Sequence, residues 1–308
     1  MAGLKHIKGK IQATERTHKV TRAMEAVSAV KMRKTQEAAL AGRSYAAAAA
    51  SIIARLAGSE YQEQHPLFQK REGNRILVLS ITSDKGLAGS VNASVLRKLD
   101  MAAKQYSPDR SLVDVYAVGK KGKEYFTHRG ARIIASAENA QDAIAMDMVQ
   151  DVVDVLTEYF LSGEYHTCLV GYPQFKSTFE QEPTVRTLLP LSVDVFEQVV
   201  REIVPDMGKY SSKTSLEKKE ADPRYLVEPS PEEVLTTLIP KLLTITVYHM
   251  LLEAKASEHS ARMVAMKNAS DKSRDVTKQL NLEFNRARQA LITREVSEII
   301  SGIEAMAT

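Results

Sequence analysis

The segment SDKGLAGS, residues 83–90, holds the residue types that come closest to a chemical site in this chain. It follows an apolar run and precedes a helical pattern, a place where the backbone N–H groups of a glycine-rich loop can bind phosphate. The segment lacks the GxxxxGK[ST] spacing of a P-loop and the GxGxxG spacing of a dinucleotide-binding turn. We therefore interpret Ser83, Asp84, Gly86 and Gly89 as a tight strand-to-helix turn rather than a nucleotide site.

The other reactive side chains form no recognisable constellation in the sequence. The seven histidines lack the spacing of metal ligands, and no GxSxG, HExxH or CxxC motif occurs. Cys168 is the single cysteine, which excludes an internal disulfide, and its apolar surroundings HTCLVGY predict a buried thiol. We expect this chain to carry no catalytic residue, no metal and no cofactor.

Strand and helix patterns alternate through residues 73–195, which we predict to form one α/β domain with a parallel sheet. Helical patterns cover residues 92–106, 120–130 and 140–163. The predicted strands, in chain order, are RILVLSIT, LVDVYAVG, ARIIAS, HTCLVGY and PTVRTLLPL.

Long helices are predicted at both ends of the chain. Residues 1–58 form the first, which we expect to end at Gly58, and residues 231–308 form the second, after the N-cap Ser230. Pro240 is expected to kink the second helix or to mark its true start. Residues 196–230 form a charged connector. The apolar stripes of these helices comprise Leu4, Ile7, Ile11, Thr14, Met24, Val27 and Lys31 in the first, and Leu280, Phe284, Ala287, Leu291, Ile292, Val296, Ile299 and Ile303 in the second.

Heptad-like steps of three and four residues indicate that the two terminal helices pair as an antiparallel coiled coil. The first 35 residues carry nine basic and two acidic side chains, an excess of +7, which predicts an acidic partner such as nucleic acid, anionic lipid or an acidic protein surface. The sequence has no uninterrupted apolar run of about 18 residues and no signal-peptide pattern. We therefore expect a soluble protein that meets a membrane only through a partner.

Three separated segments resemble the gamma subunits of F-type ATP synthases. They are HIKGKIQATERTHKVTRAMEAVSAVKMRKTQEA, SDKGLAGSVN, and the stretch that starts at EHSARMVAMKNASDKSRD and continues to SGIEA, which ends at Ala305. They occur in the order of that family. The resemblance implies a long antiparallel coiled coil formed by the N- and C-terminal helices, with an inserted Rossmann-like α/β domain.

The resemblance also implies a role as the central rotor shaft of the synthase. In that family the coiled coil fills the cavity of the alpha3beta3 ring, and the other end rests on the membrane c-ring beside the epsilon subunit. Proton flow turns the c-ring and the shaft, while ATP chemistry occurs in beta. The implied location is peripheral, at the cytoplasmic face of a bacterial inner membrane, with membrane contact through the c-ring and no nucleic acid as partner.

Ten residues match family positions that contact partner subunits or flank such contacts. Each also has a simpler interpretation, as an exposed polar face or, for the methionine, as core packing. They are Lys19, Arg22, Met24, Lys31, Arg33, Lys34, Arg262, Arg288, Gln289 and Thr293. Arg262 could contact another subunit or the N-terminal helix. Ala88 departs from the family, in which many members carry Cys.

Two alternative functions compete with the rotor. An α/β enzyme with helical arms would bind a nucleotide at residues 86–90. A basic coiled-coil protein would bind nucleic acid with a steep dependence on salt.

Overall fold

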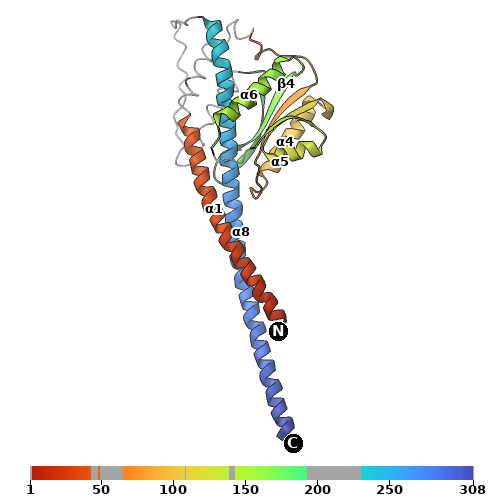
Figure 1. Ribbon diagram of the computed structural model, residues 1–308, viewed down its shortest axis with the longest axis vertical. Coiled ribbons are helices and arrows are strands. Elements are labelled where there is room, and N and C mark those ends of the chain that lie inside the picture. Colours follow the sequence, from red (N-terminus) through yellow and green to blue (C-terminus); the bar gives the residue numbers. More distant parts are fainter. Residues whose placement is uncertain are drawn as a thin grey trace. The chain divides into compact units, whose positions relative to one another are not determined.

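The computed structural model describes residues 2–42, 48, 65–107, 109–138, 143–192 and 230–307 (Figure 1). The chain divides into two compact units. One joins residues 1–28 with 263–308, and the other spans residues 29–262. The last part of the predicted first helix, residues 43–58 with its expected end at Gly58, lies almost entirely outside the described residues. The same holds for nearly all of the predicted connector 196–230.

The larger unit is built on a five-stranded sheet with the order β3-β2-β1-β4-β5. The five predicted strands are confirmed as β1 (Ile76–Ile81), β2 (Val113–Val118), β3 (Arg132–Ala137), β4 (Thr167–Phe175) and β5 (Gln181–Leu189). Strands β1 to β4 pair in parallel, but β5 runs antiparallel to β4. The prediction of a wholly parallel sheet was therefore wrong at this edge. A parallel crossover needs a dozen or more residues, and only the short turn 176–180 joins these two strands.

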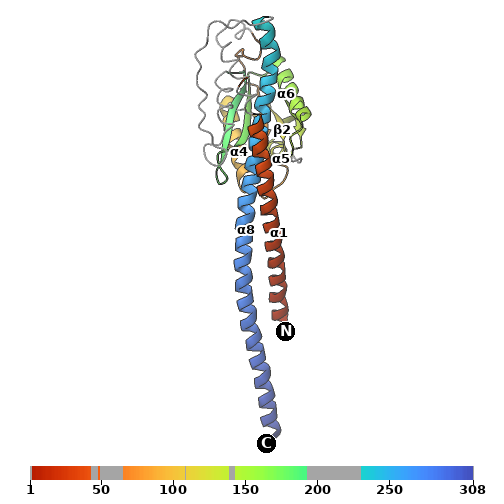
Figure 2. The ribbon, with the colours of Figure 1, turned by 90° about the vertical axis from the view of Figure 1, so that its left-hand side faces the viewer.

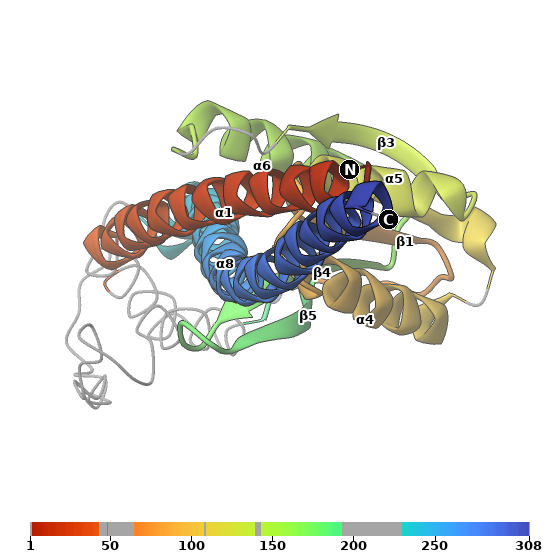
Figure 3. The ribbon, with the colours of Figure 1, turned by 90° about the horizontal axis from the view of Figure 1, so that it is seen from below.

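Helices cover both faces of the sheet and enclose two apolar cores. On one face, α4 (Val91–Tyr106) and α5 (Lys120–His128) pack against side chains such as Val78 and Val115. On the other, α6 (Met146–Leu161) and the first part of α8 (Pro231–Ala307) pack against Leu77 and Leu79. The view from below shows α4 and α6 on opposite sides of the strands (Figure 3). A short 3-10 turn, η1 (Arg110–Leu112), leads into β2.

The start of α8 agrees with its sequence signals. The Ser230 Oγ accepts a hydrogen bond from the Glu233 N–H at 3.2 Å, as an N-cap does. The helix continues through Pro240, so this proline neither ends nor starts it.

One window of α8, within Glu233–Ile303, is long and apolar enough by composition to cross a membrane. That window is 56% buried inside the protein. Within the same helix, Leu242, Leu243, Val247 and Leu251 belong to the sheet core. Burial against the sheet accounts for this composition, which is that of a core helix.

The smaller unit contains the first part of α1 (Ala2–Ala41) and the last part of α8, which run antiparallel (Figure 2). Within it the His18 ring Nδ1 lies 3.0 Å from both the Ser270 carbonyl oxygen and Oγ. The buried stripe passes through Ile11, Thr21 and Ser28. Val27 is 53% exposed, so its predicted place on the stripe was wrong, because Thr21 and Ser28 continue the three-and-four spacing instead.

The two predicted stripes of the C-terminal helix differ in their surroundings. Leu280, Phe284, Ala287 and Leu291 are partly buried. Ile292, Val296, Ile299 and Ile303 are 48–63% exposed. In this antiparallel unit α8 continues past the N-terminal end of α1, so among the described residues no helix lies beside the last turns of α8 (Figures 1 and 2).

Candidate functional site: the first sheet loop and the helix surfaces

The loop after β1 is held in place by the first turn of α4. The Asn92 Oδ1 accepts a hydrogen bond from the Ser83 N–H at 3.1 Å, and the Asn92 Nδ2 donates to the Ser83 Oγ at 2.7 Å. The Ser83 hydroxyl in turn donates to the Lys85 carbonyl at 2.7 Å. A single amide side chain thus fixes both the backbone and the side chain of Ser83, which confirms a tight turn at this position.

The same loop also docks the N-terminus of α5. The Asp84 Oδ1 accepts a hydrogen bond from the Lys120 N–H at 2.8 Å, at the positive end of the helix dipole. The Thr82 Oγ1 accepts from the Gly122 N–H at 2.8 Å and donates to the Val118 carbonyl at 3.1 Å. The place that a bound anion would take at the start of α5 is therefore occupied by a carboxylate of the chain itself.

Left-handed backbone occurs at two residues of this loop. Gly89 has a φ of 59°, a conformation that favours glycine. The second such residue is Leu87, with a φ of 63°, and not Gly86, where a Cβ would meet nothing within 4 Å. Gly86 lies in the predicted turn, but its backbone does not require glycine. Leu87 carries this unfavourable conformation while its side chain is 62% exposed.

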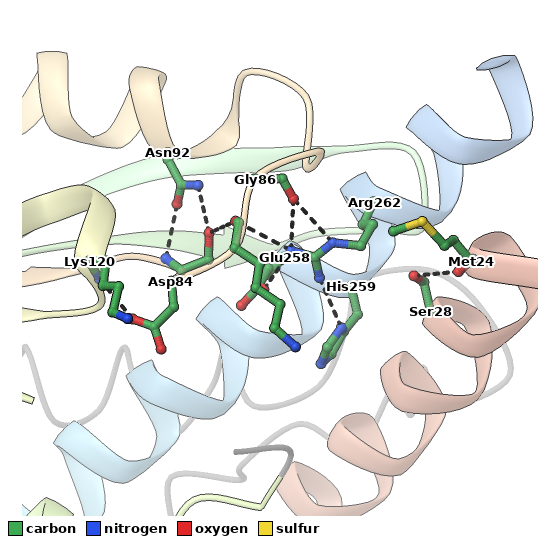
Figure 4. Close-up of polar contacts among 11 residues, drawn as sticks. Met24, Ser28, Asp84, Gly86, Asn92, Lys120, Glu258, His259 and Arg262 are labelled. Atoms are coloured by element: carbon green, nitrogen blue, oxygen red, sulfur yellow. Dashed lines mark hydrogen bonds and ion pairs between the residues drawn. The ribbon is translucent and has the colours of Figure 1, made fainter. Parts of the chain in front are cut away.

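Arg262 lies where α8 passes this loop. Its Nη2 donates to the Gly86 carbonyl at 3.2 Å and to the Glu258 carboxylate at 2.7 Å (Figure 4). The Lys85 carbonyl lies 3.5 Å away. Arg262 is only 7% exposed, and these contacts lie inside the larger unit. Its contact with another subunit or with the N-terminal helix stays a prediction. The sequence could not reveal the contact with Gly86, because the two segments are 176 residues apart.

The predicted N-terminal contact residues are mostly accessible. Lys19, Arg22, Arg33 and Lys34 are exposed, while Lys31 is partly buried. Met24 is also partly buried, and its carbonyl accepts a hydrogen bond from the Ser28 hydroxyl at 2.7 Å (Figure 4). The cations are available to an external acidic surface, as their prediction requires.

The predicted C-terminal contact residues share one exposed stretch of α8. Arg288, Gln289 and Thr293 are all exposed. The Thr293 hydroxyl donates to the Gln289 carbonyl at 3.0 Å, the usual back-bond of a helical threonine. The Arg288 and Gln289 side chains thus face solvent next to the apolar stripe that begins at Ile292.

Asn92, Ser257 and Ser260 make structural contacts that the sequence analysis did not predict. The Ser257 hydroxyl donates to the Pro173 carbonyl at 3.0 Å, and the Ser260 hydroxyl donates to the Thr178 carbonyl at 2.5 Å. Two serines three residues apart in a long apolar helix lie on the same face, and this spacing was the available signal.

A buried charge cluster lies in the same unit. Asp114, which is fully buried on β2, accepts hydrogen bonds from the Arg75 Nε at 3.0 Å and from the Tyr165 hydroxyl at 2.5 Å. Burial and then the bond to Asp114 raise the pKa of Tyr165. Cys168 is fully buried, which confirms its prediction as a buried thiol, and this burial raises its pKa. Among the described residues no group of three or more His, Cys, Asp or Glu side chains could hold a metal ion.

In chain order, a mixed α/β sheet is inserted between two long terminal helices, which is the element order of stalk-like subunits. A family model described as ATP synthase matches residues 3–306. The ATP synthase gamma chains of Cupriavidus pinatubonensis and Cupriavidus necator are 36% and 37% identical to this chain, covering 99% of it and all of each relative. That of Opitutus terrae is 37% identical over the whole of both chains. The chain belongs to the family of ATP synthase gamma chains.

Solved structures agree with this assignment. The central stalk of the Tetrahymena thermophila mitochondrial ATP synthase has a similar chain, with a TM-score of 0.59 and 25% identity over 82% of this chain and 99% of that one. A chain of the Euglena gracilis mitochondrial enzyme shares the fold, with a TM-score of 0.64 and 16% identity over 99% and 95% of the two chains. The predicted fold is thereby confirmed. As a gamma chain, the protein is a subunit of a membrane-associated complex.

Proposed function

We propose that this chain is the central rotor shaft that couples proton flow through a membrane c-ring to ATP synthesis and hydrolysis at the beta subunits. In this role it carries no catalytic residue. Its partners are the alpha3beta3 ring, the epsilon subunit and the c-ring, and it lies at the cytoplasmic face of a bacterial membrane through the c-ring.

The observation that carries the proposal is the last part of α8. From Ile292 onward its apolar stripe is exposed, and Arg288, Gln289 and Thr293 face solvent just before it. An isolated helix with such a stripe needs an external surface to cover it. A surrounding ring provides that surface without a fixed partner helix.

The cations of α1 support a contact that can be broken at each step of rotation. Lys19, Arg22, Arg33 and Lys34 are exposed. Exposed ion pairs are worth about 0–1 kcal/mol each, so an acidic surface on beta could pair with these cations and release them as the shaft turns. Dense apolar interlocking would instead trap one angle.

The test is to mix the purified chain with alpha and beta subunits and to measure assembly and Mg-ATPase activity. We expect a stoichiometric complex whose activity requires this chain. In the complete synthase, Arg288→Ala and Gln289→Ala should lower ATP synthesis, while Arg274→Ala, at another exposed arginine of α8, should not. If no complex forms but the isolated chain binds nucleotide, the rotor proposal fails and the 86–90 loop becomes the site to study.

A further inference from the structure

The contact between α8 and the sheet changes character along the helix. From Leu235 to Ala254 the helix contributes apolar side chains to the core, including Leu243, Val247 and Leu251. From Ser257 to Arg262 its buried side chains are mainly polar. Apolar contacts are non-directional, and the Thr244 Oγ1 adds a hydrogen bond to the Gln150 Oε1 of α6 at 3.3 Å, so the first part holds the helix on the sheet mainly through burial.

Three side chains of the polar part donate to backbone carbonyls at the carboxyl end of the sheet. Ser257 donates to Pro173, Ser260 donates to Thr178 at the β4–β5 turn, and Arg262 donates to Gly86 in the β1–α4 loop. We name Ser257, Ser260 and Arg262 the carbonyl clasp. Hydrogen bonds are directional, so the clasp defines one rotational position of α8.

Arg262 is the charged member of the clasp. Its guanidinium is nearly buried, and its charge is balanced by Glu258 one turn earlier on the same helix, at 2.7 Å (Figure 4). A planar guanidinium can hold two acceptors in fixed directions, which a lysine ammonium cannot. The loop that it holds is also tied to α4 by Asn92 and to α5 by Asp84. The bond from Arg262 thus connects α8 to a loop already fixed to two other helices.

We propose that the carbonyl clasp is the joint through which torque passes between the sheet unit and α8. This inference rests on the proposed rotor function. Arg262 is the last α8 residue of the larger unit, so the clasp fixes the helix at the end of its contact with the sheet. Ser257, Ser260 and Arg262 are positioning residues, since they contact this chain itself.

The experiment uses membrane vesicles with the complete synthase, in which the chain carries Glu258→Gln, Ser260→Ala and Arg262→Gln. Glu258 is changed as well so that no unpaired buried carboxylate remains. The matched control, Asp271→Asn with Arg274→Gln, removes an exposed ion pair from the same helix. We measure ATP hydrolysis and proton-driven ATP synthesis in the same vesicles. Spin labels at Met101→Cys and Lys267→Cys report the distance distribution between sheet unit and helix.

For the clasp variant we expect synthesis to fall about fivefold or more, because the hydrogen bonds of both Ser260 and Arg262 to the sheet unit are lost, while hydrolysis stays near the unmodified rate. The spin-label distance distribution should broaden, and the control should change neither readout. A clasp variant with full synthesis and an unchanged distribution would overturn the proposal.

A cross-link tests whether Arg262 acts by fixing α8 to the β1–α4 loop or by contacting another subunit directly. Gly86→Cys and Arg262→Cys are joined by a short bismaleimide. A Cβ at residue 86 meets nothing within 4 Å, and the native Cys168 is fully buried, so background labelling is low. Linking should restore synthesis. A linked chain that stays defective refutes the clasp, whereas an unmodified chain that fails to support ATPase assembly refutes the rotor function itself.

Discussion

At Gly119 the backbone turns from β2 into α5 with a φ of 92°, and a Cβ there would lie 2.1 Å from the Thr82 carbonyl oxygen. An alanine at this position would be strained by the left-handed backbone, and the main chain at Thr82 could not move away from the added Cβ at low cost. We expect Gly119→Ala to destabilise the chain by about 3 kcal/mol or more, as measured by urea unfolding.

Gly86→Ala is the matched control for that substitution. Its Cβ would lie in open space, and its φ is not in the left-handed region. The variant should be neutral or more stable by about 0.5 kcal/mol, because alanine restricts the unfolded chain. Equal effects of the two substitutions would contradict this account of the loop.

Tyr165 supports the fully buried carboxylate of Asp114 with a hydrogen bond of 2.5 Å. Tyr165→Phe leaves that oxygen with Arg75 alone, so we expect a loss of about 1–3 kcal/mol in unfolding free energy. Tyr106→Phe, at a tyrosine that is 45% exposed, should change the unfolding free energy by less than about 0.5 kcal/mol.

The phenol of Tyr165 also predicts an alkaline dependence of stability. Its folded pKa is raised above the ordinary value of 10.0, so the folded state holds this proton more tightly than the unfolded state. The contribution of the protonated Tyr165 phenol to the free energy of unfolding is complete below pH 10. It is lost as the pH rises above that value. Unfolding measured between pH 9 and pH 11 should show a steeper decline for the unmodified chain than for Tyr165→Phe.

At the scale of elements, each strand and helix of the α/β region could be predicted from period and turn residues. The antiparallel pairing of β5 could have followed from the short turn 176–180, which is too brief for a crossover. The stripe of α1 was misplaced at Val27 because threonine and serine fill the buried positions, and a hydropathy pattern overlooks them. The Arg262 contact joins distant segments, which no local pattern encodes.

Helix α8 carries a buried histidine beside the end of α1. A Cβ at Gly42 would lie 3.2 Å from the Cε1 of His249, and burial lowers the pKa of His249 to about 4. In the unfolded state the His249 imidazole has a pKa near 6.5 and binds a proton more readily than in the folded state. The contribution of neutral His249 to the free energy of unfolding is therefore complete above pH 6.5, and it falls as the pH drops towards 4. The decline should reach the order of 3 kcal/mol.

The substitution His249→Leu should flatten that acid limb in urea unfolding measured from pH 7 to pH 4. His6→Leu, at an exposed histidine, should retain it. An acid limb of unchanged slope in His249→Leu would show that other groups cause the decline.

At the scale of the whole molecule, the sequence of each terminal helix serves two purposes. The part of α8 up to Ala254 has an apolar face because the sheet buries it, whereas the part after Leu291 has one although this chain leaves it exposed. Apolar periodicity alone could not separate these cases, because both present the same spacing. Only the contact of the first part with the sheet distinguishes them.

Removal of residues 292–308 tests this distinction. Ile292, Val296, Ile299 and Ile303 bury little surface in the chain, so the thermal midpoint of the purified chain should stay within about 2 °C of the full-length value. Self-association in sedimentation should decrease, because an exposed apolar stripe favours it. Truncation after Leu280 is the control, since it also removes the partly buried Phe284 and Leu291 and should lower the midpoint. A large loss of stability in the first truncation would mean that the last turns of α8 pack within the chain rather than await the surface of another subunit.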